Sequence, residues 1–210
     1  MKKKLLVFLM ILMMCILSGC GMKEEEVKAY VEASLDAAYK GEFDAFVEIT
    51  ESTPEGAKAM YEENIVHIME AAGFSDLELE DDLTEKYKEL FLSLIKKVDY
   101  SVGEVEREEN ESFAVEVMVN PMTILSGIED ELTDNLLGRI DELEEFPSED
   151  EIVHMSFEEM YSILSERVEE PEYSNESKVI TIHLHKNEKG MYAIDEEDML
   201  ALDASLFVVE

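Results

Sequence analysis

The cysteine at position 20 stands where the chain changes from apolar to charged, and its surroundings suit chemistry on the sulfur. Three lysines, Lys2 to Lys4, precede an apolar run over residues 5–17. Ser18 and Gly19 then place two small side chains before the thiol, which leaves the sulfur accessible. The run is too short for an ordinary transmembrane helix, which needs about 20 apolar residues. Its length and basic start predict a secretory signal segment.

The four residues Leu17-Ser18-Gly19-Cys20 resemble the lipobox of bacterial lipoproteins. The resemblance implies that Cys20 receives a diacylglyceryl group through a thioether, and that a peptidase cuts between Gly19 and Cys20. Residues 1–19 are then a cleaved signal peptide, and two acyl chains suffice for stable anchoring. The alternatives are an ordinary signal peptide or an uncleaved anchor. We expect a lipid-anchored protein on the extracytoplasmic face of the cell membrane, with Cys15 discarded in the signal.

The sequence His183-Leu184-His185 is the sharpest local pattern in the rest of the chain. Residues two apart on a strand face the same side, so both imidazoles could ligate zinc or copper. A zinc site needs three or four ligands, however, and the other histidines, His67 and His154, fall on expected helices. The alternative is a polar strand face opposite buried aliphatic side chains. We predict no metal site, with His183 and His185 as the candidates to test.

His154 lies between Glu151 and Glu158 at helical spacing and could form a pair with either carboxylate. Such a pair can act as a general base, but a surface pair is the interpretation we favour. His67 lies in an otherwise apolar helical segment and is expected to be a partly buried core residue. No nucleophile-elbow, phosphate-loop or dinucleotide motif occurs in the sequence, so we predict no catalytic and no cofactor-binding residues.

Acidic residues dominate the composition, with 52 Asp and Glu against 17 Lys and Arg and a formal charge of -35. Loss of residues 1–19 would remove three lysines and bring the charge to -38. This balance argues against nucleic acid as a partner, because phosphate binding requires basic patches. Acidic clusters such as 78–82 suggest calcium, but no segment has the glycine and oxygen ligands of an EF-hand loop. A solvated surface that keeps the protein soluble is the simpler interpretation.

The remaining chain alternates between two hydrophobic periods. Apolar residues three and four apart predict helices, and Gly41, Pro54 and the Ser148/Glu151 pair mark helix ends or starts. A period of two over 113–119 predicts a half-buried strand. The expected helices span 24–40, 43–47, 54–72, 82–98, 124–140, 149–168 and 196–207, and the expected strands span 100–105, 113–120, 178–186 and 191–195.

These elements predict one α+β domain over residues 24–210, joined to the lipidated cysteine by the short tether 20–23. The N-terminal helices are expected to pack on a curved antiparallel sheet of about four strands. A helical insertion separates the two expected hairpins, and a short helix closes the chain.

This order of elements resembles the cystatin-like or nuclear-transport-factor-2-like arrangement, in which a curved sheet wraps a long helix. It is more similar to a set of Gram-positive lipoproteins of unknown function, through the segment from Tyr30 to Phe46 and the segment 187–206, "NEKGMYAIDEEDMLALDASL". Tyr192 stands where such families often carry Trp. The resemblance implies the fold but brings no catalytic residues.

The expected function is that of a membrane-anchored lipoprotein with a non-enzymatic binding or accessory role toward a small ligand or an envelope partner. The alternative is an enzyme that uses a cup-shaped pocket of the same domain. A buried Asp or His with a shifted pKa in the cup would favour catalysis. The binding subunit of a transporter needs a two-lobed repeat that the sequence lacks.

Overall fold

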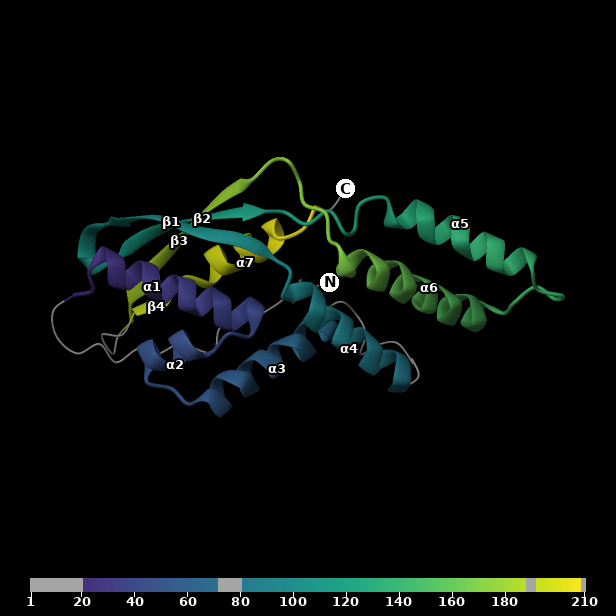
Figure 1. The fold of residues 1–210 in the computed structure, drawn as a ribbon, viewed down its shortest axis with the longest axis horizontal. Coiled ribbons are helices and arrows are strands. Elements are labelled where there is room, and N and C mark those ends of the chain that lie inside the picture. Colours follow the sequence, from purple (N-terminus) through teal and green to yellow (C-terminus); the bar gives the residue numbers. More distant parts are fainter. Residues whose placement is uncertain (1–20, 72–80, 188–191, 209–210) are drawn as a thin grey trace, which may run out of the picture.

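The computed structural model describes residues 21–71, 81–187 and 192–208. Helices and one antiparallel sheet make up these ranges, so the expected α+β class is confirmed. Figure 1 shows helices gathered below the sheet and a pair of helices that extends to one end of the molecule. The helices are α1 (Glu24–Leu35), α2 (Asp44–Thr50), α3 (Pro54–Ala71), α4 (Asp81–Ile95), α5 (Ile128–Asp141), α6 (Glu149–Glu169) and α7 (Glu196–Ser205), and the strands are β1 (Asp99–Arg107), β2 (Phe113–Asn120), β3 (Lys178–Lys186) and β4 (Tyr192–Ile194).

The sheet has one buried and one exposed face. Its four strands, within the described residues, run antiparallel in the order β1-β2-β3-β4. Alternate residues of β2 from Phe113 to Val119 are fully buried, whereas Glu116 and Met118 are exposed on the other face. Met118 pairs with Val179 of β3, so the exposed face continues across the strands. The period of two in the sequence therefore predicted both the strand and its orientation.

Helices cover the buried face of the sheet (Figure 1). α1 packs against β1 and β2, and α7 packs against β3. Val27, Val31 and Leu35 of α1 and Leu202 of α7 are fully buried in the same core as the strands. The face of the sheet that the helices cover is therefore filled by the apolar core.

The first helix ends earlier than predicted. A helix was expected over 24–40, but the α-helix stops at Leu35 and residues Asp36–Lys40 form a π-helical turn. Each hydrogen bond of a π turn spans one residue more than in an α-helix, and the turn places the buried ring of Tyr39 in the core. Gly41 ends the segment at φ 68°, a left-handed conformation that glycine adopts without strain. The predicted glycine cap is therefore confirmed.

The helical insertion between β2 and β3 is the α5–α6 pair, which extends away from the sheet (Figure 1). α5 begins at Ile128 and not at Ile124 as predicted. Gly127, with φ 66°, interrupts the helical path, and residues 124–127 form a turn. The start of α6 agrees with the prediction, because the Ser148 hydroxyl accepts the Glu151 amide and the Glu151 carboxylate accepts the Ser148 amide at 2.8 Å.

Two further helix ends differ from the prediction. α4 stops at Ile95, and Val98 is buried after a turn over residues 96–97 rather than from the helix itself. α7 stops at Ser205 because the last residues pair with other segments. The predicted end of α3 at residues 72–73 and the predicted turn at 188–190 lie outside the described residues.

Candidate functional site

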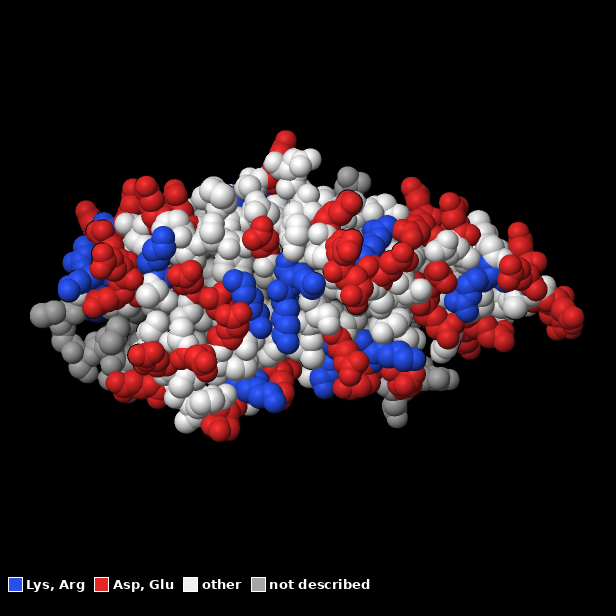
Figure 2. Space-filling view, viewed as in Figure 1, with Lys and Arg blue, Asp and Glu red and all other residues white. Residues whose placement is uncertain are grey.

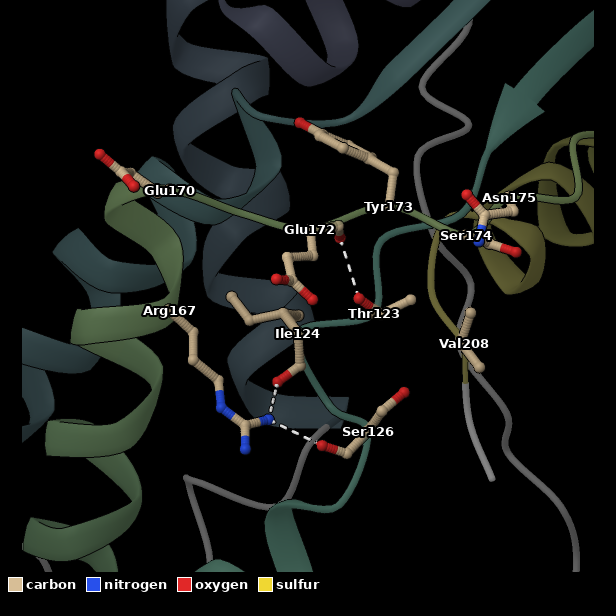
Figure 3. Close-up of a pocket in the computed structure, with 10 residues that line it drawn as sticks. All are labelled: Thr123, Ile124, Ser126, Arg167, Glu170, Glu172, Tyr173, Ser174, Asn175 and Val208. Atoms are coloured by element: carbon tan, nitrogen blue, oxygen red, sulfur yellow. Dashed lines mark hydrogen bonds between the residues drawn. The ribbon is translucent and has the colours of Figure 1, made fainter.

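An open cavity of about 750 Å³ lies at the base of the α5–α6 pair. Its walls come from the segment after β2, the end of α6, the loop before β3 and the C-terminal segment (Figure 3). The lining residues are Thr123, Ile124, Ser126, Arg167, Glu170, Glu172, Tyr173, Ser174, Asn175 and Val208.

Met122, which is fully buried, joins three of these segments. It forms β-bridges with Tyr173 and Phe207. Its amide donates to the carbonyl of Leu206 at 2.8 Å, and its carbonyl accepts the amide of Val208 at 2.9 Å. Main-chain hydrogen bonds therefore fix the walls of the cavity.

Arg167 is the only Lys or Arg among the described residues that line the cavity. Its Nη1 donates to the carbonyl of Ile124 at 2.7 Å and to that of Ser126 at 2.9 Å, the two bonds that converge on its guanidinium in Figure 3. Its Nη2 pairs with Glu131 of α5. The protein itself engages this guanidinium, so Arg167 fastens α6 to the turn before α5 instead of offering its charge to an anion.

Two carboxylates line the cavity together with hydroxyl and amide groups that can both donate and accept hydrogen bonds. Glu170 and Glu172 are exposed carboxylates. The hydroxyl of Thr123 donates to the Glu172 carbonyl at 3.1 Å (Figure 3), which leaves its oxygen as an acceptor. A ligand that donates hydrogen bonds, such as an ammonium compound or a polyol, fits this lining better than an anion does. None of the described lining residues is His, Cys or Asp.

Sequence reasoning did not find this cavity. Its walls come from loops at 121–126 and 170–175, which only the folded insertion brings together. One signal was present: Arg167 is the only Lys or Arg between residues 140 and 177. A single cation in so acidic a stretch indicates a structural anchor, and a turn rich in carbonyl groups is a natural partner for it.

His183 and His185 lie next to each other on the exposed face of the sheet. Their rings are parallel within 2°, with centroids 6.1 Å apart. His183 Nδ1 lies 2.7 Å from Asp198 Oδ2, which also accepts the His183 amide at 2.7 Å. His185 Nε2 lies 3.7 Å from Asp195. Over the described ranges, no three His, Cys, Asp or Glu side chains come together as metal ligands.

The His183–Asp198 pair holds α7 against the edge of β3, and its loss should have a small effect. We expect His183→Ala to lower the free energy of unfolding by about 1 kcal/mol or less, because the pair is partly exposed and Asp198 keeps the backbone amide. Zinc content should not change. Urea denaturation and elemental analysis of the purified protein measure both, with the more exposed His185→Ala as the control. A stoichiometric, chelator-sensitive metal that either variant loses would contradict the expectation.

The other sequence candidates lie apart from the cavity. Cys20 and the cleavage site after Gly19 are outside the described residues, and so is the side chain of His67. His154 Nδ1 lies 3.8 Å from Glu158 Oε1 in a partly exposed pair. Glu151 does not contribute to that pair, because its carboxylate accepts hydrogen bonds from Ser148.

A group of partly buried polar side chains joins the end of the first helix to α7 and β1. The Tyr39 hydroxyl donates to Asp203 Oδ1 at 2.6 Å, and the Tyr100 hydroxyl donates to Asp36 Oδ1 at 2.6 Å. The two tyrosine rings meet edge to face with centroids 5.9 Å apart. Lys40 pairs with Asp36 at 2.8 Å and lies over the Tyr100 ring. These contacts explain why the chain leaves the α-helical path at Asp36.

Asp203 is a partly buried acid that sequence reasoning missed. Burial raises its pKa to about 7, and the hydrogen bond from Tyr39 opposes part of that rise. Burial, and then the charge of Asp203, raise the pKa of Tyr39 well above its usual value. Asp203 Oδ2 is buried without a hydrogen-bond partner in the described structure. A buried Asp with a shifted pKa was the expected sign of catalysis, but Asp203 does not line the cavity.

Carboxylates cover much of the molecular surface. On the face shown in Figure 2, acidic side chains are widespread and reach the far end of the α5–α6 pair, while Lys and Arg are fewer and scattered. None of the helices in the described ranges is long and apolar enough to cross a membrane.

Comparison with known proteins supports the fold. No protein-family model matches the chain, and no curated protein matches its sequence. The structure is similar to the crystal structure of a Bacillus subtilis protein described as a "putative lipoprotein (ycdA)", with a TM-score of 0.61 and 16% sequence identity. The similarity covers 89% of this chain and 58% of that chain, so this chain spans less than two thirds of the length of its neighbour. At this identity the likeness concerns the fold.

Proposed function

We propose that this protein is a lipoprotein of the extracytoplasmic membrane face, anchored by a diacylglyceryl group on Cys20, with a non-enzymatic binding or accessory role. The lipobox-like residues before Cys20 support the anchor. The fold that the chain shares with a protein described as a lipoprotein is consistent with this class. Its acidic surface argues for partners other than nucleic acid.

The folded domain begins immediately after Cys20, and this is the main structural support for an anchor at that position. Met22 is only 3% exposed and belongs to the core. The Arg107 guanidinium donates to its carbonyl at 2.6 Å, and α1 starts at Glu24. Gly21 is then the only residue between the lipid-bearing position and the core. Two extended residues span at most about 7 Å, so anchoring at Cys20 would hold the domain at the lipid headgroups.

The part of the molecule near this anchor carries basic side chains. Arg107 and Glu111 lie next to Gly21, and Lys186 pairs with Glu111 at 2.6 Å. Lys23 precedes α1. Glu24, Glu25 and Glu26 follow Lys23 in the first turn of α1, so these cations reduce but do not reverse the repulsion between the acidic domain and anionic headgroups.

In this role, the cavity at the base of the α5–α6 pair is the binding site for a ligand. Its acceptors, Glu170 and Glu172, would favour a cationic or polyol ligand. Catalysis is the weaker alternative, because the acid with the raised pKa, Asp203, lies outside the lining.

Substitution of the two cysteines tests the anchor. We expect Cys20→Ala to abolish incorporation of labelled palmitate and to release the protein from alkali-washed membranes, because the thioether cannot form. Cys15→Ala is the matched control, since Cys15 lies in the apolar run that is cleaved off. It should leave both labelling and fractionation unchanged. Persistent labelling of the Cys20→Ala variant would rule out the anchor.

A further inference from the structure

The loop that joins α5 to α6 presents an aromatic side chain to solvent. We propose that this loop, residues 142–148, hereafter the hairpin tip, docks into an apolar pocket rimmed by Lys and Arg on another protein of the cell envelope. Phe146 at its centre is 80% exposed. Leu143 in the same loop is also exposed. Burial of a Phe side chain removes a large apolar surface from water, which makes Phe146 a natural anchor for an interface.

The hairpin tip is held in a defined conformation. Pro147 is buried directly after Phe146. Ser148 is held through both its backbone and its side chain, because the Glu151 carboxylate accepts its amide at 2.8 Å and its hydroxyl at 2.7 Å. The Leu143 amide donates to the Ile140 carbonyl at 3.1 Å. A loop that is already ordered loses little conformational entropy when it binds, so the exposed ring is suited to docking.

The charge around Phe146 specifies the partner. Residues 140–166 contain ten Asp and Glu and no Lys or Arg. The last cation before them, Arg139, pairs with Glu158 and Glu159 of α6, so its charge is engaged outside the hairpin tip. Charge complementarity therefore selects a basic rim around the pocket that receives Phe146. The same charge opposes an anionic bilayer and a second copy of this acidic tip.

The position of the hairpin tip also favours a protein partner. Figure 1 shows α1 beginning at one end of the molecule and the α5–α6 loop at the opposite end. α6 has 21 residues, and a helix of that length extends about 30 Å. If Cys20 carries the lipid, as the proposed function holds, the tip points away from the membrane. α6 packs against α4 through Phe157 and Tyr161, which meet the ring of Tyr87. Along 129–156, Pro147 is the only residue of the described chain that is buried, so the half of the pair nearest the tip projects as an arm.

Photocrosslinking at the tip identifies what it touches. The photoreactive residue benzoylphenylalanine is incorporated in place of Phe146 in the full-length protein, which is expressed in the cells from which it comes. A matched control carries the same residue in place of Val179. Val179 is 54% exposed, but it lies on the open face of the sheet. We expect position 146 alone to give a discrete adduct with another protein, which mass spectrometry identifies.

The crosslinked partner is then purified, and its affinity for the full-length chain in detergent tests the roles of the aromatic ring and of the acidic charge. Phe146→Ala should weaken binding at least about tenfold, the effect of an interface anchor. Glu144→Gln with Glu145→Gln should weaken binding and reduce its dependence on salt. Val179→Ala should change neither. Phe146 is exposed, so the variants should keep the urea midpoint of the parent protein.

Several results would overturn the proposal. These are the absence of a protein adduct at position 146, an adduct with lipid, an adduct with a second copy of this chain, or an affinity that Phe146→Ala changes less than twofold. The Cys20→Ala experiment decides the anchor separately, and the binding measurement in detergent does not need it.

Discussion

Asp203→Asn should make the stability of the protein much less sensitive to pH between about pH 4 and pH 7. The carboxyl group of Asp203 has a pKa of about 7 in the folded state against an ordinary value of 3.8, mainly because it is buried. Asparagine is nearly isosteric and cannot ionise. It can also still accept the hydrogen bond of Tyr39. The variant therefore isolates the cost of a buried charge.

The raised pKa fixes the sign of the effect. Well below pH 3.8 the side chain is protonated in the folded and the unfolded protein, and it causes no loss. Between pH 4 and pH 7 the unfolded chain ionises first, so the folded state binds more protons and loses stability as pH rises. Well above pH 7 the loss is complete. A shift from 3.8 to about 7 corresponds to a loss on the order of 4 kcal/mol.

Urea denaturation of both proteins at pH 4, 5, 6, 7 and 8 measures this loss. The variant should exceed the parent only slightly at pH 4 and progressively more up to pH 7, and the difference should become constant near pH 8. Tyr39→Phe removes the hydrogen bond that opposes the rise in pKa, so in this variant the decline should continue to higher pH. A difference between Asp203→Asn and the parent that is the same at every pH would refute the role assigned to Asp203.

Arg167→Met should loosen the base of the α5–α6 pair and lower the free energy of unfolding by about 2–3 kcal/mol. Methionine keeps much of the buried stem of the side chain. It removes the donors to the carbonyls of Ile124 and Ser126 and the pair with Glu131. The loss of a charged donor leaves two partly buried carbonyls without their partner.

Arg139→Met is the matched control, because it removes a similar side chain from the same helical pair. Within the described residues, Arg139 pairs with the carboxylates of Glu158 and Glu159, and it is more exposed than Arg167. Its loss should cost about 0.5 kcal/mol or less. Hydrogen exchange should show faster opening of α5 amides in Arg167→Met and not in Arg139→Met. Equal effects of the two substitutions would mean that the carbonyl contacts of Arg167 do not hold the base.

Much of the fold could be predicted because local rules and packing agree along most of the chain. The alternation from Phe113 to Val119 defined β2 and its buried face. The Ser148/Glu151 pair set the start of α6, and Gly41 set the end of the first helical segment. In each case the residue whose type predicted the element also defines that element in the structure, by burial of its side chain, by a capping hydrogen bond or by its left-handed conformation.

The predictions failed where distant contacts decide the local structure. The spacing of apolar residues from Ile124 onward suits a helix, but the Ile124 carbonyl accepts a hydrogen bond from Arg167, far along the chain. The π-helical turn at Asp36 depends on Tyr100 and Asp203, which the sequence gives no means of placing nearby. The cavity depends on loops that meet only after α5 and α6 pair. No local pattern records such contacts.

The insertion of α5 and α6 between two paired strands also affects how the protein folds. β2 and β3 are neighbours in the sheet, but residues 121–177 separate them in the chain. If α5 and α6 pair first, only residues 121–127 and 170–177 remain to be closed as a loop. The shorter loop lowers the entropic cost of bringing β2 to β3 by roughly 1 kcal/mol. A helical arm that forms early would therefore speed assembly of the central strands, and the contacts of Arg167 would set the folding rate as well as the final stability.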